Sequence, residues 1–352
     1  MGYQRVVVTA KGGPEVLQVI TESDLPEPAP GEVRVKVLAA GTGFTDTAIR
    51  RGNYPDVRDS PPFTPGYDFA GEVDKLGTGV SGLSIGQCVV DMPVIGGYSQ
   101  YCVRPAASLI PIPARLGPID LAEAACLPLS YMTAYQMLHR LREFDAGERV
   151  LIQGASGAVG TALLDLGRQM GLRMLGTCSP AKFDLVRSYG ATPIDYRGGN
   201  LVARVRAWSA EDGQGTGEGV DAVFDAIGGH RQWADAMACL RPRGLLVAYG
   251  AQHIARGEDS LVSVLWGFAK LFGWWRWAGR GGRRATFYII TKRREQKPDE
   301  YRADMLHLLD LLAKGKIRPL IAARRPLRDA RAVHEDIDAG RISGKVVLLP
   351  WQ

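Results

Sequence analysis

The chain has 352 residues, 46% of them hydrophobic and 23% charged, with a formal net charge of +6. This length is too great for one core and indicates two domains, and the charge content is ordinary for a globular protein. The modest positive excess suits phosphate-bearing ligands. No basic stripe interleaved with aromatic residues is present, so we expect no nucleic-acid partner.

The cysteines and the N-terminal segment bear on the compartment. The five cysteines are scattered without a C-x-x-C pair, which argues against a disulfide framework or a zinc knuckle and fits a reducing cytosol. The first residues, "MGYQRVVVTAKGGPE", contain no apolar signal core, and no apolar run approaches the roughly 20 residues that a spanning helix needs. We therefore expect a cytoplasmic protein.

The first part of the chain is predicted to be rich in strands. The first 110 residues contain β-branched runs such as "RVVVTA" and "EVRVKVLAAG", cut by Gly and Pro. Residues 119–141 then carry apolar side chains at helical spacing, with Asp120 as an expected N-cap and Pro128 as an expected break.

From residue 149 the pattern changes to strand, glycine turn and helix. Strands are expected in the runs "RVLIQG" (149–154), "RMLGTC" (173–178), "GVDAVFDAIGG" (219–229) and "LLVAYG" (245–250), which amphipathic segments separate. This alternation indicates βαβ units and a parallel sheet. Two further helices and a closing strand at 344–350 are expected after residue 290.

A glycine-rich turn follows the strand expected in the run 149–154. Its glycines have the spacing G-x-x-G-x-x-G, and a helical pattern begins directly after them. Small residues are needed where a strand turns sharply into a helix whose N–H groups face a closely approaching phosphate. A tight structural turn is the alternative, but the strand–turn–helix context favours dinucleotide binding. The expected cofactor-binding residues of this turn are Gly154, Ser156, Gly157, Ala158, Val159 and Gly160.

The end of the next strand indicates which dinucleotide binds. NAD sites usually place an acid there for the ribose 2′-hydroxyl. This chain has Ser179 and Lys182 instead, and Asp184 lies one turn into the helix. A hydroxyl and a cation suit a 2′-phosphate, which a carboxylate would repel. We therefore predict NADPH; in the alternative, Lys182 is a solvated helix residue.

Several segments, in one order along nearly the whole chain, resemble the medium-chain dehydrogenases/reductases, in the zinc-free quinone oxidoreductase (zeta-crystallin-like) branch. The segments are "GGPEVL" (12–17), "DTAIRRGNYP" (46–55), "TPGYDFAGEV" (64–73), "GVSGLSIGQCV" (79–89), "AACLPLSYMTAY" (124–135), "GASGAVG" (154–160), "GATPIDYR" (190–197) and "GRISGKVVLLP" (340–350). Within the branch the chain is similar to the vesicle amine transport protein group, through "SYMTAY" and a Trp-rich segment.

The resemblance implies an α/β architecture of two domains. A GroES-like β-rich catalytic domain would comprise residues 1–126 and 291–352, and a Rossmann doubly wound parallel-sheet domain would bind NADPH with residues 127–290. By motif, Lys182, Tyr196 and Arg341 match positions that bind the 2′-phosphate in NADPH-using relatives. Thr133 matches a threonine near the nicotinamide ribose, and Gly250 lies in a strand-end loop that contacts the cofactor. Family habit implies a homodimer.

The zinc ligands of the alcohol dehydrogenases in this superfamily are replaced. Their first cysteine position is Gly43, and their "GHE" reads Gly66, Tyr67 and Asp68. The four-cysteine lobe is absent and the five histidines show no paired spacing, so we predict no metal. Without a Lewis acid, the easier reaction is hydride delivery to an electrophilic acceptor such as a quinone or an α,β-unsaturated carbonyl.

Three tyrosines are the candidate catalytic residues. Tyr54 matches a cleft tyrosine of the branch, Tyr67 replaces the zinc histidine, and Tyr131 precedes Thr133 by two residues. A phenol can donate a hydrogen bond or a proton to a developing enolate. The alternatives are that these rings only line the cleft, or that water supplies the proton. Many relatives carry Asn where this chain has Gly43, so one polar contact is missing.

The segment 261–284 contains Trp266, Trp274, Trp275 and Trp277 and ends in an arginine cluster. A narrow stripe of Ser263, Gly267 and Lys270 interrupts an otherwise apolar helical pattern, so most of the helix must be buried. Three partners remain open: a second subunit, the substrate cleft, or an anionic membrane surface.

Two functional classes follow from the sequence. The leading one is a zinc-independent, NADPH-dependent reductase of quinones or enones. The alternative is a membrane-associated NADPH-binding protein with little turnover; an enoyl reductase of polyketide or lipid synthesis would share the chemistry of the first.

Overall fold

The structure is a computed structural model that describes residues 2–211, 217–250, 266–267, 269–274 and 280–352. The chain divides into two compact units, Met1–Thr133 with Arg294–Gln352, and Ala134–Arg293. The boundaries expected from the sequence, after residues 126 and 290, lie close to these divisions and stay a prediction. Helices α3 (Met132–His139) and α11 (Ile290–Gln296) contain the two points at which the chain passes between the units.

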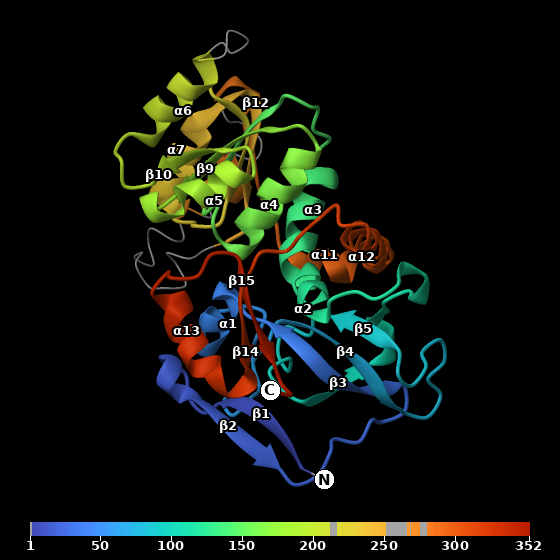
Figure 1. Cartoon of the computed structure of the whole chain (residues 1–352). Helices are drawn as coiled ribbons and strands as arrows, with labels where there is room; N and C mark the ends of the chain where they lie inside the picture. The colour runs from blue at the N-terminus through green and yellow to red at the C-terminus, as the bar shows by residue number, and fades with distance from the viewer. Residues whose placement is uncertain (1, 212–216, 251–265, 268, 275–279) are drawn as a thin grey trace. The chain divides into compact units, whose positions relative to one another are not determined.

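The first unit is built on a mostly antiparallel sheet with the strand order β14-β15-β3-β4-β5-β7, and β6 also pairs with β3. Its strands are β3 (Glu32–Gly41), β4 (Asp68–Leu76), β5 (Cys88–Asp91), β6 (Tyr101–Pro105), β7 (Ile110–Pro111), β14 (Ile321–Pro326) and β15 (Lys345–Leu349). A separate hairpin pairs β1 (Tyr3–Val8) with β2 (Leu17–Glu22). Both ends of the chain therefore contribute to this unit, as the GroES-like prediction requires (Figure 1).

Short helices accompany this sheet: α1 (Phe44–Arg50), α2 (Leu121–Ala124), α12 (Pro298–Ala313) and α13 (Ala330–Asp338). The Asp120 carboxylate accepts a hydrogen bond from the Ala122 N–H at 2.9 Å, which confirms the expected N-cap of α2. The expected break at Pro128 is a single π-helical turn, η4 (Leu127–Tyr131), between α2 and α3. Helix α13 packs against α1 (Figure 1).

The second unit is built on a six-stranded parallel sheet with the order β10-β9-β8-β11-β12-β13. Its strands are β8 (Arg149–Gln153), β9 (Arg173–Cys178), β10 (Thr192–Asp195), β11 (Val220–Asp225), β12 (Leu240–Ala248) and β13 (Arg284–Phe287). Its crossover helices are α4 (Ala158–Gln169), α5 (Phe183–Ser188), α6 (Leu201–Ala210) and α7 (His230–Cys239), seen around the sheet in Figure 1. The chain turns outward from β8 in both directions, so the predicted βαβ pattern and doubly wound sheet are confirmed.

The apolar strand residues explain this layering. Leu151, Val223 and Leu246 come from the three central strands and share one core with Trp233 of α7. Because a parallel sheet is covered on both faces, its strands are apolar throughout rather than alternating. Within the described residues, every helix is too short or too polar to span a bilayer.

Candidate functional site

The predicted glycine turn connects β8 to α4. Gly154 has φ +74°, a conformation that favours glycine, and its N–H donates to the Thr177 hydroxyl at 3.1 Å. Gly157 is the N-cap of α4 and supplies no side-chain cap. A Cβ on Gly160 would lie 2.3 Å from the Gly154 carbonyl oxygen, so the helix can start this close to the strand only with glycine. The first N–H groups of α4 therefore face outward from a turn without side-chain bulk, as an anion-binding helix start requires.

The same edge of the sheet carries further features that fit a bound ligand. Gly250 follows β12, and a Cβ there would lie 2.2 Å from the Ala226 carbonyl oxygen. The buried side-chain amide of Gln153 and the buried hydroxyl of Tyr249 have no hydrogen-bond partner among the described residues. The register pairs Asp225 with both Gln153 and Ala248, so these groups follow three adjacent strands. This carboxyl edge offers polar atoms that the protein does not itself use, which is the usual place for a ligand in such a sheet.

The predicted 2′-phosphate residues lie at the ends of two paired strands. The register pairs Cys178 of β9 with Asp195 of β10, so Ser179 and Lys182 follow one strand where Tyr196 follows its neighbour. Burial lowers the pKa of Lys182. Tyr196 is 59% exposed, and the Arg197 Nε lies 3.0 Å from its hydroxyl oxygen.

Arg197 is a second cation at this edge that the sequence analysis did not select. The signal was present, because Arg197 is adjacent to Tyr196 in "IDYR". The nearby acid Asp184 pairs with Arg187 at 2.9 Å. The charges at these strand ends therefore suit an added phosphate.

Two other predicted cofactor residues belong to the first unit. Arg341 pairs with Asp336, with Nη2 and Oδ1 2.6 Å apart. Thr133 is 4% exposed, in the first turn of α3. Their cofactor contacts stay predictions.

Tyr54 and Tyr67 form a hydroxyl pair in the first unit. Their Oη atoms lie 2.6 Å apart and their rings meet edge to face at 87°. Tyr67 is 0% exposed and directly precedes β4, whereas Tyr54 is half-buried after α1. Burial raises the pKa of Tyr54 to about 12 and that of Tyr67 well above its ordinary value. Both rings are therefore neutral phenols at neutral pH, able to donate a hydrogen bond or a proton.

Tyr131, the third candidate, ends the π-helical turn η4 and is 3% exposed. Its hydroxyl chemistry stays a prediction. The π-helical turn itself is a local irregularity of the kind that often occurs at functional sites.

The positions of the zinc ligands hold groups that do not fit a metal. Gly66 has φ +112°, and a Cβ on it would lie 2.4 Å from the Tyr98 backbone nitrogen. The Asp68 carboxylate is occupied by Lys345, whose Nζ lies 2.5 Å from Oδ2. Across the described ranges, no group of three or more His, Cys, Asp or Glu side chains could hold a metal ion. The positions of the zinc ligands therefore do not offer a donor set that suits zinc.

An acid that the sequence analysis missed lies beside these positions. Asp46 is 1% exposed in α1, and its Oδ2 accepts a hydrogen bond from the Gly43 N–H at 2.9 Å. The sequence signal was its place three residues after an N-cap glycine, where a carboxylate normally completes a capping box.

The Trp-rich segment is described only in part. Ser263, Trp275 and Trp277 lie outside the described residues, so the predicted stripe cannot be followed along its length. A Cβ on Gly267 would lie 3.0 Å from the Trp233 ring of α7, and Leu271 is fully buried. Trp266 is 56% exposed, with the Lys270 Nζ 5.1 Å from its ring centroid. The described part of this segment thus packs within the second unit and exposes one tryptophan.

Comparison with known proteins gives the family. Residues 29–114 match the family described as "Alcohol dehydrogenase GroES-like domain", and residues 190–348 match "Zinc-binding dehydrogenase". A 2-haloacrylate reductase from Burkholderia sp is 32% identical over 98% of each chain. A synaptic vesicle membrane protein VAT-1 homolog from Danio rerio is 28% identical over 98% of this chain and 70% of that protein. The solved Escherichia coli quinone oxidoreductase, in complex with NADPH, has a TM-score of 0.84 at 29% identity and covers 99% of this chain and 100% of its own.

The two units and their matches define a two-domain dehydrogenase/reductase. The chain belongs to the medium-chain dehydrogenase/reductase superfamily, in its quinone oxidoreductase branch. The predicted family and fold class are therefore confirmed. The zinc in one family description has no matching donor set at the positions discussed above.

Proposed function

We propose that this protein is an NADPH-dependent oxidoreductase that transfers a hydride to a quinone or to an α,β-unsaturated carbonyl compound, without a metal. The main observation in favour of such an acceptor is the partly buried hydroxyl pair of Tyr54 and Tyr67, whose oxygens lie 2.6 Å apart. The named activities of the relatives, quinone oxidoreductase and 2-haloacrylate reductase, both require an electrophilic acceptor of this kind.

On the cofactor side, the glycine turn before α4 holds the pyrophosphate, and Ser179, Lys182 and Tyr196 bind the 2′-phosphate. NADPH, when bound, supplies the hydride. The glycine turn and the cationic strand ends support this choice, as does the NADPH in the Escherichia coli relative. Arg341, Thr133 and Gly250 complete the proposed cofactor contacts.

On the acceptor side, negative charge builds on the acceptor oxygen as hydride reaches carbon. Tyr54 and Tyr67 are neutral phenols joined by a hydrogen bond. One hydroxyl holds the other in position, and the pair donates a hydrogen bond or a proton to the acceptor oxygen. Tyr131 is the third proposed donor. An enoyl reductase acting in polyketide or lipid synthesis would use the same groups and differ only in substrate.

A direct assay tests the function. NADPH oxidation should be followed by absorbance with a panel of quinones, enones, 2-haloacrylate and enoyl thioesters, and repeated with NADH. We expect turnover with NADPH and a clear preference for it over NADH. Lys182→Ala should reduce this preference, and Arg187→Ala, which removes a neighbouring cation paired with Asp184, should leave it intact. Equal use of NADH by the parent protein would contradict the cofactor assignment.

The tyrosine pair has its own test. Tyr67→Phe and Tyr54→Phe should each lower kcat by about 10²-fold or more if the pair donates the proton. A change below about tenfold in both variants would mean that the rings only shape the pocket.

A peripheral membrane contact and a homodimer are second proposals. The exposed Trp266 beside Lys270, together with the VAT-1 homolog relatives named for a vesicle membrane, favours a contact with anionic lipid through 261–284. Sedimentation with anionic and neutral liposomes tests it, and pelleting with neither would exclude it. Light scattering on a sizing column would give the subunit number. In the alternative function, NADPH and lipid would bind without turnover in the acceptor panel.

A further inference from the structure

The buried acid Asp46 is a polar group of the first unit that the proposed reaction leaves unexplained. Its side chain is 1% exposed, and one carboxylate oxygen, Oδ2, accepts a hydrogen bond from the Gly43 N–H. The other oxygen, Oδ1, is buried as well, and the backbone N–H of Tyr67 and the hydroxyl of Tyr98 also hydrogen-bond the carboxylate. A buried carboxylate whose hydrogen-bond partners are all neutral is costly, so a functional explanation is needed.

Two charged groups face Asp46 from neighbouring strands. They are Asp68 at the start of β4 and Lys345 at the start of β15, whose charged atoms lie 2.5 Å apart with both side chains buried. Asp46, Asp68 and Lys345 together comprise two carboxylates and one lysine. Because Lys345 pairs with Asp68, the negative charge of an ionised Asp46 has no matching positive charge among these three groups.

A hydrogen-bonded chain reaches Asp46 from α13 through the Tyr98 hydroxyl, which hydrogen-bonds the Asp46 side chain. Arg50 Nη1 lies 3.1 Å from His334 Nδ1, and Tyr98 Oη lies 3.2 Å from His334 Nε2. A guanidinium only donates, so Nδ1 accepts and the proton of the neutral ring sits on Nε2, which donates to Tyr98. Burial, followed by Arg50, lowers the pKa of His334 to about 3, which agrees with this neutral tautomer. The chain therefore brings no positive charge of its own beyond Arg50, which pairs with Asp338 at 2.7 Å.

Asp46 is linked to Tyr67 by a hydrogen bond from the backbone and to Tyr54 by an electrostatic interaction. Burial, followed by the Asp68 carboxylate, raises the pKa of Asp46 to about 7. Lys345 and the backbone N–H groups of Gly43 and Tyr67 act in the opposite direction and lower this pKa. The charge of Asp46 in turn contributes to raising the pKa of Tyr54. Asp46 thus touches the backbone beside one tyrosine of the pair and acts electrostatically on the other.

We propose that Asp46 is a positioning residue of the acceptor site, and that its gain of negative charge weakens the hydroxyl pair as a proton donor. This inference rests on the reductase function proposed above. When Asp46 is neutral, Tyr54 and Tyr67 donate more readily. When Asp46 is ionised, its charge makes the Tyr54 phenol a weaker acid, and proton transfer to the acceptor slows.

The test is the pH profile of kcat with NADPH and an accepted enone, for the parent protein, Asp46→Asn and Asp56→Asn. In the parent, kcat should fall by about threefold to tenfold between pH 6 and pH 8. Asp46→Asn keeps the shape and the acceptor for the Gly43 N–H but carries no charge, so its profile should be flat across this range. Asp56→Asn removes an exposed carboxylate that also acts on both tyrosines, and it should keep the fall.

A spectroscopic readout separates a titrating acid from a merely structural one. Infrared difference spectra of the parent protein between pH 6 and pH 8 should show the loss of a protonated-carboxyl band, which Asp46→Asn should lack. The inference would be wrong if kcat of Asp46→Asn fell with pH as much as kcat of the parent, or if the parent showed no protonated-carboxyl band. Either result would leave the reductase function intact. Absence of turnover with every acceptor would instead overturn the proposed function, and this inference with it.

Discussion

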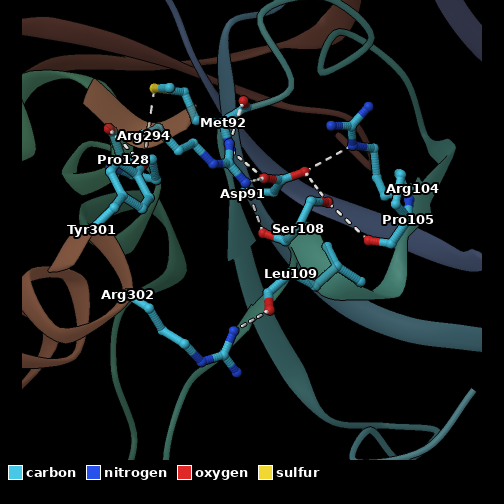
Figure 2. Close-up of polar contacts among 10 residues, drawn as sticks. All are labelled: Asp91, Met92, Arg104, Pro105, Ser108, Leu109, Pro128, Arg294, Tyr301 and Arg302. Carbon is cyan, nitrogen blue, oxygen red and sulfur yellow. Dashed lines mark hydrogen bonds and ion pairs between the residues drawn. The ribbon is translucent and has the colours of Figure 1, made fainter. Parts of the chain in front are cut away.

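Two buried aspartates of the same unit, Asp91 and Asp46, have opposite surroundings. Asp91 Oδ2 lies 2.7 Å from Arg104 Nε and accepts from the Ser108 hydroxyl at 3.1 Å. Its Oδ1 lies 2.7 Å from Arg294 Nη2 and accepts from the Met92 N–H at 2.7 Å. Figure 2 shows the carboxylate enclosed by these groups. Asp46 is instead hydrogen-bonded by neutral groups: the Gly43 N–H at 2.9 Å, the backbone N–H of Tyr67 and the hydroxyl of Tyr98.

The difference distinguishes a carboxylate with a structural role, Asp91, from one that can gain or lose a proton in the folded protein, Asp46. A buried carboxylate held by two arginines and further donors has a structural role, because removing it would leave the arginines without a partner. A buried carboxylate whose hydrogen-bond partners are neutral can accept a proton without leaving a charged partner unpaired. The Asp91 cluster also anchors the segment beginning at Arg294, whose Nη1 donates to the Met92 carbonyl at 2.7 Å, exactly where the chain re-enters this unit.

The largest expected effect comes from breaking the Asp91 cluster. Asp91→Asn should lower the free energy of unfolding of the first unit by about 3–5 kcal/mol, because two partly buried arginines lose their charged partner. The measurement is urea denaturation followed by amide hydrogen exchange in β4 and β5, which belong to this unit. Asp310→Asn is the control: its exposed pair with Lys314 should contribute about 0.5 kcal/mol or less. If Asp91→Asn lowered the free energy of unfolding as little as the control does, Asp91 would not have the structural role that distinguishes it from Asp46.

The next effect concerns Asp46 and pH. Its pKa is raised from 3.8 to about 7 in the folded protein, so the folded state holds a proton that the unfolded state has lost between these values. Stability is therefore highest below about pH 4 for this group and falls as pH rises through 7. At about 1.4 kcal/mol per pKa unit, the fall amounts to at most about 4 kcal/mol.

Asp46→Asn isolates this contribution. The free energy of unfolding should be measured from pH 5 to pH 8 for both proteins, and the parent should lose stability relative to the variant as pH rises. Subtracting the two profiles removes the opposite trend of His334, whose lowered pKa destabilises the folded state as pH falls below about 6.5. Parallel profiles would mean that Asp46 stays ionised in the folded protein across this range of pH.

The parts of the fold that the sequence predicted rest on local patterns. The turn at Gly154 follows from residues a few positions apart, and the strand ends carrying Lys182 and Tyr196 follow from the βαβ rhythm. Asp120 as a cap and Pro128 as a break are local as well.

The parts that it could not predict depend on distant pairings. Asp91 and Arg294 are 203 residues apart, and Asp68 and Lys345 are 277 apart. Nothing near either residue in the chain marks its partner, since an Asp or Arg in a strand or helix is most often a solvated surface residue. The sequence selected Tyr54 and Tyr67 separately, but the hydrogen bond that joins them forms only when the fold brings the segment after α1 to the segment before β4. Asp46 was missed for the same reason, because the side chains that surround it, Asp68, Tyr98 and Lys345, come from later parts of the chain.

The smallest expected effect concerns Tyr301, and it tests how much of the stability of the Asp91 cluster comes from the ion pairs and how much from packing. Tyr301 lies under the Arg294 guanidinium, with its carbon 5.1 Å from the ring centroid, and its hydroxyl donates to the Pro128 carbonyl at 3.1 Å (Figure 2). Tyr301→Phe keeps the ring and loses only the hydroxyl, with its hydrogen bond to Pro128 and its weaker contact with the Met92 sulfur, so it should cost about 1 kcal/mol of unfolding free energy. Tyr301→Leu removes the ring as well and should cost about 1–2 kcal/mol more. Equal costs in the two variants would mean that the ring does not support Arg294, and that the ion pair with Asp91 alone secures the re-entry of the chain at this point.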